Sequence, residues 1–578
     1  MSDGHFDVVI CGGGLAGLTL ALQLRQELPD ATVAIVERTA RPLPRGAHKV
    51  GESSVEAGSM YLERLGLRRY LHENQIIKFG LRFFPGGGHL PIDQRWEIGP
   101  RADPIVDSYQ MDRGKLERDL RDLVVERGAT LFEGTTVTAV ELGEADAPHR
   151  VRLDGDALTA RWVVDATGRA AFLRKRLKLN RPSEHQAHAG WFRLSGKVDI
   201  NEMVADPADP WRQRLGAESR WRSTNHFMGD GYWVWVIPLV DGRTSIGVVV
   251  HDERHGFDDV RTLERCWAFL DAHEPTRSAF LKAHLAAGHE VLDFKCLKGY
   301  SHDVAQSWSP NRWAVVGEAG AFVDPLYSPG TDFIAMANSF TTAIVRSDLE
   351  GADLAQRCAE LDAHYASLVQ WATGVFRGAA PVYGYAPAMA TKYYWDNFIY
   401  WSYFCQFLQQ RIHALRGDAL AAFVPVRERF FEVTARMQTL LRHWALLAPT
   451  QPAQGQFVPM PHLISLNADV HVALVHQMTP AETLAYFERR ADQADEMLTE
   501  TVLRVLQELG PEQGRRLVEA SGLTAWDLRF SSARIEAETL DAEAREAALS
   551  LVARDLDRNL YPLRRHPRSV EAMRLVTD

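Results

Sequence analysis

The hydrophobic pattern at the start of the chain predicts a buried β-strand that turns directly into a helix. Val8, Val9 and Ile10 form a short apolar run, and small and apolar residues follow it. A second apolar run at residues 32–36 ends on Glu37. Strand, helix and strand in this order predict a unit with parallel strands.

An alternating pattern predicts one half-buried strand over residues 76–84. The odd-numbered residues from 77 to 83 are apolar, whereas Lys78, Gly80 and Arg82 occupy the other face. A helix is predicted at residues 112–127, where leucines and a valine recur on one side.

The later part of the chain changes from strands to helices. Residues 186–300 are rich in predicted strands, a strand at 313–316 returns to the first unit, and most of the chain from about residue 333 is helical. Aromatic residues surround the predicted helix at 393–404, so this helix should be buried or line an apolar cavity. The sequence therefore predicts an α/β protein, α+β overall, with a Rossmann-like domain (1–185 and 301–375), an interleaved β-rich substrate domain (186–300) and a C-terminal helical region (376–578).

Composition narrows the class of protein. The 578 residues are 46% hydrophobic and carry a formal net charge of −10, which disfavours nucleic acid as a partner. The five cysteines form no CxxC pair and no metal-ligand spacing, so we expect no metal site and a reducing compartment. No export signal and no apolar run of membrane-spanning length is visible, which predicts a cytoplasmic protein without a membrane span.

The turn after the first strand carries the fingerprint of a dinucleotide site. Gly12, Gly14 and Gly17 have the spacing that allows a tight turn, close approach of a pyrophosphate and close packing of helix on strand. Glu37 follows the last glycine by about 20 residues, where an acid binds a ribose hydroxyl.

Two further motifs occur in a fixed order after this fingerprint. They are Asp-Ala-Thr-Gly-Arg at 165–169 and Gly-Glu-Ala followed by Asp324-Pro325 at 317–325. This order resembles the FAD-binding fold of the flavoprotein monooxygenase and reductase superfamily, which implies FAD as the cofactor and an acid on its ribityl hydroxyls. No second dinucleotide fingerprint is visible, so we expect a separate flavin reductase to supply reduced flavin.

A third motif narrows the resemblance. Trp233, Trp235, Ile237 and Pro238 match the WxWxIP motif of flavin-dependent halogenases, and the segment 49–53 is similar to one that lies near the flavin in that family. Taken alone, the two tryptophans also fit an ordinary strand, because residues two positions apart share one face and can be buried together.

The halogenase resemblance implies a set of site residues. Reduced FAD, oxygen and halide would give hypohalous acid, which a lysine directs onto an electron-rich ring; by position this lysine is Lys78, with Lys49 as the competitor. Trp233, Trp235, Pro238 and Tyr327 would line the tunnel and the substrate site. The expected cofactor contacts are Gly12, Gly14, Ala16, Gly17, Glu37, Arg38, Ser53, Arg113, Gly168, Gly317, Asp324 and Gly330.

Chloride or bromide would rest on backbone N–H groups of Ser328, Gly330 and Thr331. Pro329 removes one N–H from this turn, and Asp332 would repel an anion unless its side chain points away and caps the following helix. Tryptophan halogenases carry a glutamate at the position of Tyr327. The resemblance is therefore closer to phenol and pyrrole halogenases, whose small aromatic substrate is free or carried on a protein.

Two other functions stay open. Pro329 and Asp332 favour a halide-independent FAD monooxygenase or oxidoreductase that acts on a large apolar or polyene-like substrate. A non-catalytic flavoprotein that binds a partner through its helical tail would hold FAD without oxygen-dependent turnover.

Overall fold

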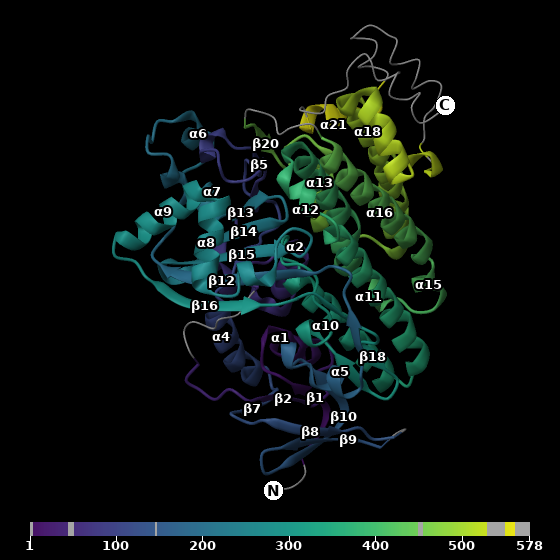
Figure 1. Ribbon diagram of the computed structural model, residues 1–578. Coiled ribbons are helices and arrows are strands. Elements are labelled where there is room, and N and C mark those ends of the chain that lie inside the picture. The colour runs from purple at the N-terminus through teal and green to yellow at the C-terminus, as the bar shows by residue number, and fades with distance from the viewer. Residues whose placement is uncertain are drawn as a thin grey trace.

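The computed structural model describes residues 4–43, 51–144, 147–448, 455–526, 528 and 549–560. Two eight-stranded sheets and a large group of helices make up this part of the chain (Figure 1). The α/β class predicted from the sequence is confirmed. Among the described residues, no helix combines the length and apolar character needed to cross a membrane.

The first sheet has a parallel core built around the N-terminal strand. Val9 lies between Val163 and Ala34 of the neighbouring strands, and all three side chains are buried. Helices α1 (Leu15–Glu27) and α10 (Gly330–Leu349) pack together in the same hydrophobic core. The main path of strands is β18 (Trp308–Ser309), β19 (Trp313–Val315), β10 (Ala157–Asp165), β1 (Gly4–Cys11), β2 (Val33–Glu37) and β7 (Thr130–Glu133), with β8 (Val137–Glu141) and β9 (His149–Leu153) beside β10.

The second sheet draws on three separated stretches of the chain. Five of its strands come from residues 186–300, but three come from elsewhere, so this sheet extends beyond the predicted range of the substrate domain. Its strands, in spatial order, are β16 (Val291–Leu297), β12 (Ala187–Ser195), β15 (Arg243–His251), β14 (Tyr232–Leu239), β13 (Thr224–Gly229), β4 (Leu81–Phe84), β5 (Glu97–Gly99) and β20 (Phe457–Pro459).

The prediction of one half-buried strand over residues 76–84 is wrong. The segment forms β3 (Ile76–Ile77), which pairs with β6 (Tyr109–Gln110), and β4, which joins the second sheet. Gly80 separates them with φ of +109°, a conformation that favours glycine. The pattern also misled on burial, because Lys78 and Arg82 are both fully buried.

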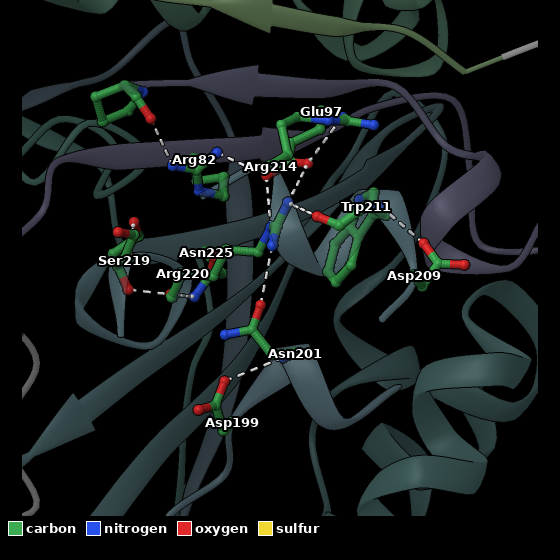
Figure 2. Close-up of polar contacts among 12 residues, drawn as sticks. Arg82, Glu97, Asp199, Asn201, Asp209, Trp211, Arg214, Ser219, Arg220 and Asn225 are labelled. Atoms are coloured by element: carbon green, nitrogen blue, oxygen red, sulfur yellow. Dashed lines mark hydrogen bonds and ion pairs between the residues drawn. The ribbon is translucent and has the colours of Figure 1, made fainter. Parts of the chain in front are cut away.

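Arg82 is buried beside an acid, Glu97, which it shares with a second arginine, Arg220 (Figure 2). The Glu97 carboxylate on β5 accepts hydrogen bonds from Arg82 at 2.7 Å and from Arg220 at 2.8 Å. Arg82 also donates to the carbonyl of Pro100 at 2.8 Å. Buried charges need such partners, since an unpaired one would be strongly destabilising.

The helical region packs beside both sheets, on the right in Figure 1. Its aromatic segment at residues 393–404 continues from α13 into a short π-helix, η8 (Tyr400–Cys405). Almost every side chain of this segment is buried, as its all-round aromatic pattern predicts. The main helices are α11 (Leu354–Phe376), α12 (Ala380–Gly384), α13 (Ala386–Ile399), α16 (Val424–Leu447) and α18 (Pro480–Ser521).

Candidate active site

The glycine turn after β1 forms the floor of a large cavity. Gly12 has φ of +114°, and a Cβ atom there would lie 2.4 Å from the carbonyl oxygen of Ala166. A Cβ atom on Gly17 would lie 2.0 Å from the carbonyl oxygen of Gly12. Larger residues therefore cannot hold the β1–α1 turn against the segment after β10. This leaves the backbone open to a ligand at the N-terminus of α1.

This cofactor cavity has a volume of about 700 Å³, which suits a dinucleotide. Glu37 stands at the end of β2 and accepts hydrogen bonds from the N–H groups of Gly13 at 2.7 Å and Thr39 at 2.8 Å. Although burial acts to raise it, these hydrogen bonds and Arg121 hold the pKa of Glu37 below its usual value. The predicted cofactor residues in the walls are Gly12, Gly14, Ala16, Glu37, Arg38, Arg113 and Gly168.

Two predicted cofactor residues do not line this cavity or the two described below. Gly17 acts through the packing just described. The Asp324 carboxylate is buried elsewhere, where it accepts hydrogen bonds from Tyr300 at 2.6 Å and from His185 at 2.7 Å. Glu318, three positions after the end of β19, lines the cofactor cavity instead. The sequence signal for Glu318 was the Gly-Glu-Ala motif itself, in which the acid directly follows a strand.

A smaller cavity of about 90 Å³ adjoins the cofactor cavity, with which it shares Arg113 and Trp235. Trp233 and Trp235 project from one face of β14 into its wall, while Pro238 on the same strand does not line it. Ser328 also lines this cavity, in a backbone turn where its φ is +60°. The other predicted residues in this middle cavity are Ser53, Gly317, Gly330 and Thr331.

A third cavity, the aromatic pocket, has a volume of about 240 Å³ and shares Pro329 and Phe333 with the middle cavity. Tyr327 lines it and donates a hydrogen bond to Asp396 at 2.9 Å. The pocket also takes much of its wall from the aromatic segment: Tyr393, Tyr400, Trp401 and Phe404.

Lys78 lies between β3 and β4 and reaches the aromatic pocket. Its ammonium group is fully buried and donates hydrogen bonds to Ser53 Oγ at 2.9 Å and to the carbonyl of Ser54 at 2.8 Å. Burial lowers the pKa of Lys78 to about 7, against the opposing effect of Glu56 and Asp332. Because Ser53 lines the middle cavity, its hydrogen bond with Lys78 links the lysine to the wall of that cavity as well. Lys49 lies outside the described residues.

Comparisons with known proteins show what the chain is similar to. A family model described as an FAD binding domain matches residues 5–253. The flavin-dependent halogenase chlA of Dictyostelium discoideum is 28% identical over 69% of this chain and 70% of its own length. The 1H-pyrrole-2-carbonyl-[peptidyl-carrier protein] chlorinase of Pseudomonas fluorescens is 27% identical over 57% of this chain and 73% of its own length. The chain is therefore related to flavin-dependent halogenases.

The fold of the chain also matches solved structures. The structure of halogenase PltM in complex with phloroglucinol and FAD superposes with a TM-score of 0.61 at 15% identity, over 85% of this chain and 96% of that one. The flavin-dependent brominase Bmp2 gives a TM-score of 0.51 at 19% identity, over 65% of this chain and 87% of that one. The chain is an FAD-dependent oxidoreductase, and its relatives support FAD-dependent halogenation.

Asp332 does not cap its own helix, which was one alternative expected from the sequence. Its carboxylate crosses to the first turn of α2 (Glu56–Leu62), where it accepts hydrogen bonds from the N–H of Gly58 at 2.7 Å and the hydroxyl of Tyr400 at 2.9 Å. Burial raises the pKa of Asp332 to about 8, against these hydrogen bonds. The side chain therefore faces the aromatic pocket rather than the middle cavity.

Three residues near Lys78 were not predicted as site residues. Glu56 and Tyr400 line the aromatic pocket, and the Ser54 carbonyl binds the ammonium group. The sequence signal that could have identified Ser54 is the Gly-Glu-Ser segment at 51–53, which Ser54 directly follows. Tyr400 is distant in sequence, so only the packing of η8 against α2 brings it to the site.

Proposed function

We propose that this halogenase forms hypohalous acid in the middle cavity and that Lys78 directs it onto an electron-rich aromatic substrate in the aromatic pocket. When bound, reduced FAD would supply the two electrons that convert one atom of O2 to water, while the other oxygen atom oxidises the halide and ends in the hypohalous acid. The observation that carries the proposal is the position of the buried Lys78. This residue lines the aromatic pocket, and its ammonium group donates a hydrogen bond to Ser53 in the wall of the middle cavity. A separate flavin reductase would provide the reduced FAD.

FAD fits the residues of the cofactor cavity. The glycine turn leaves room for a pyrophosphate at the N-terminus of α1. Glu37 is ionised and stands at the end of the second strand, where it can accept a hydrogen bond from a ribose hydroxyl. Glu318 supplies an acid for the ribityl hydroxyls at the boundary with the middle cavity.

Chloride or bromide would bind at the start of α10. The first N–H groups of a helix have no partner within the helix, and those of Gly330 and Thr331 lie beside the middle cavity. Pro329 takes the N-cap position, so its missing N–H removes none of the donors that the helix itself provides. Asp332 faces away from this anion site, because its carboxyl group is bound on the side of the aromatic pocket.

Lys78 would act through its charge. A protonated amine polarises hypohalous acid and stabilises the hydroxide that leaves as the ring attacks the halogen. The contacts with Ser53 and Ser54 hold the ammonium group, while the cavity wall excludes bulk water and strengthens the interaction.

The aromatic pocket favours a phenol-like or pyrrole-like ring. Its walls are mainly aromatic and aliphatic, with Asp332 and Tyr400 as polar groups near the lysine. The pyrrolyl-carrier-protein chlorinase among the relatives supports a substrate carried on a protein, and free rings are the other form to be tested.

A halide-independent oxidation of a large apolar or polyene-like substrate is the second candidate. The observation in its favour is the largely apolar wall of the aromatic pocket, which would accept such a chain equally well.

Product mass spectrometry separates the two functions. The FAD-loaded enzyme would be run with a flavin reductase and oxygen on phenols, pyrroles, carrier-linked pyrroles and polyenes, with bromide, with chloride and without halide. Halogenation predicts a halide-dependent isotope pattern that is lost in Lys78→Met and retained in Lys282→Met, which changes a half-exposed lysine. A product that gains oxygen or loses hydrogen regardless of halide would support the second candidate.

A further inference from the structure

Outside the three cavities, two histidines and an aspartate meet inside the protein. His185 precedes β12, His251 ends β15 and Asp324 lies between β19 and α10, so three distant segments converge. One ligand atom from each residue lies within 4.8 Å of the other two. All three side chains are at most 2% exposed. Two imidazoles and a carboxylate form a donor set typical of zinc and related divalent transition metals.

Two distances describe this cluster: the longer suits two ligands of a single ion, and the shorter is that of a hydrogen bond. The Asp324 carboxylate oxygen lies 2.7 Å from Nε2 of His185 and 3.9 Å from Nε2 of His251. Ligands that bind zinc at about 2.0–2.2 Å are separated from one another by roughly 3–4 Å. The longer distance is too great for a hydrogen bond, so direct pairing of His251 with Asp324 does not explain its position.

The independent observation is that the imidazole ring of His251 lacks hydrogen-bond partners among the described residues. Neither ring nitrogen of His251 makes a hydrogen bond to any described residue, although the side chain is buried. The buried hydroxyl of Tyr383 also has no partner among the described residues, and its ring lies 5.3 Å from that of His251. Unpaired buried polar groups are costly, and two of them beside a carboxylate indicate a missing ligand.

The surroundings of the cluster hold Asp324 in place for such a ligand. Its second carboxylate oxygen accepts the N–H of Leu326 at 2.9 Å, and Tyr300 donates to the first at 2.6 Å. Hydrogen-bonded carboxylates of this kind are common among metal ligands, because the second contact fixes their orientation.

We propose that His185, His251 and Asp324 bind one divalent transition metal ion of the zinc class, with Tyr383 or water as the fourth ligand. The ion would tie the two sheets together at the base of the loop 324–331. This loop carries Tyr327 and the turn proposed to bind halide, so the metal would stabilise that loop. The three residues line none of the three cavities, so the metal would take no part in the oxidation. The absence of a metal site expected from the cysteine and histidine spacing in the sequence would then be wrong.

Metal analysis of the full-length chain tests the proposal. The FAD-loaded protein, purified without a histidine tag, should contain about one equivalent of zinc, and cobalt substitution should give visible absorption bands typical of a protein-bound ion. His251→Leu should lower the metal content roughly tenfold or more. The control is His289→Leu, which alters an exposed histidine stacked on His284 at 4.0 Å and should leave the metal content unchanged.

Thermal unfolding provides a second readout. If a metal is bound, a strong chelator should lower the melting temperature of the wild type and leave that of His251→Leu unchanged. If the cavity holds only water or nothing, His251→Leu should be as stable as the wild type or more stable, because it removes an unpaired imidazole.

Two results would overturn the assignment. One is less than about 0.1 equivalent of metal in the wild type after incubation with zinc, cobalt or ferrous ion. The other is the same metal content in His251→Leu as in the wild type. The cobalt spectrum of the wild type needs no variant, so it decides the question even if His251→Leu does not fold.

Discussion

Lys78→Met should make the enzyme much less active and more stable at the same time. In the folded protein burial lowers the pKa of this lysine from 10.5 to about 7. At about 1.4 kcal/mol for each unit of pKa, holding the charged ammonium group costs about 5 kcal/mol at pH 6, where it is protonated in both the folded and the unfolded chain. Methionine removes this cost and keeps most of the volume.

The substitution also removes the donor to the Ser54 carbonyl, which offsets the gain by about 1–3 kcal/mol. The expected net rise in the free energy of unfolding is about 2–4 kcal/mol at pH 6, measured by urea denaturation. Halogenation should fall by roughly 10²–10³-fold, because one preorganised charge is lost from the reacting centre. FAD affinity should not change.

Lys392→Met is the matched control, because Lys392 is equally buried but has an acid as its partner. Its ammonium group binds Asp396 at 2.9 Å and Gln438 at 2.6 Å. Removing it leaves a buried carboxylate without its cation, so this variant should lose about 3–5 kcal/mol. The reasoning about Lys78 is refuted if Lys78→Met is destabilised to a similar extent, or if it halogenates at the wild-type rate.

Three further outcomes are expected. The halogenation rate should fall as the pH rises through about 7 rather than near 10.5, because the folded protein releases the proton of Lys78 there; a rate that stays constant up to about pH 9 would contradict this. Asp332→Asn removes an acid that raises the pKa of Lys78, so the descending limb of the pH profile should move to lower pH, and a shift in the other direction would exclude that role. Gly12→Ala places a Cβ atom 2.4 Å from the Ala166 carbonyl and should abolish FAD binding in a fluorescence titration, whereas Gly374→Ala has nothing within 4 Å and should bind FAD normally.

The sequence was most informative where structure depends on neighbours along the chain. The glycine turn after β1 and the helix α4 (Arg113–Glu126), whose N-cap Asp112 accepts the N–H of Lys115, follow from local spacing and side-chain chemistry. The same spacing predicted the cofactor residues Glu37 and Arg38, which line the cofactor cavity. Such motifs are readable because the backbone conformation they need is set within a few residues.

The sequence alone could not show which side chains meet across the fold. Alternation placed Lys78 and Arg82 on the polar face of one strand, but the chain turns at Gly80 and the structure buries both against groups far away in sequence. Asp324 follows the motif expected to hold the flavin, yet its carboxylate faces His185 and Tyr300. A periodic pattern records which face of one element is apolar. Burial, charge partners and the meeting of His185 with His251 depend on how separate elements pack, and only the tertiary structure decides that.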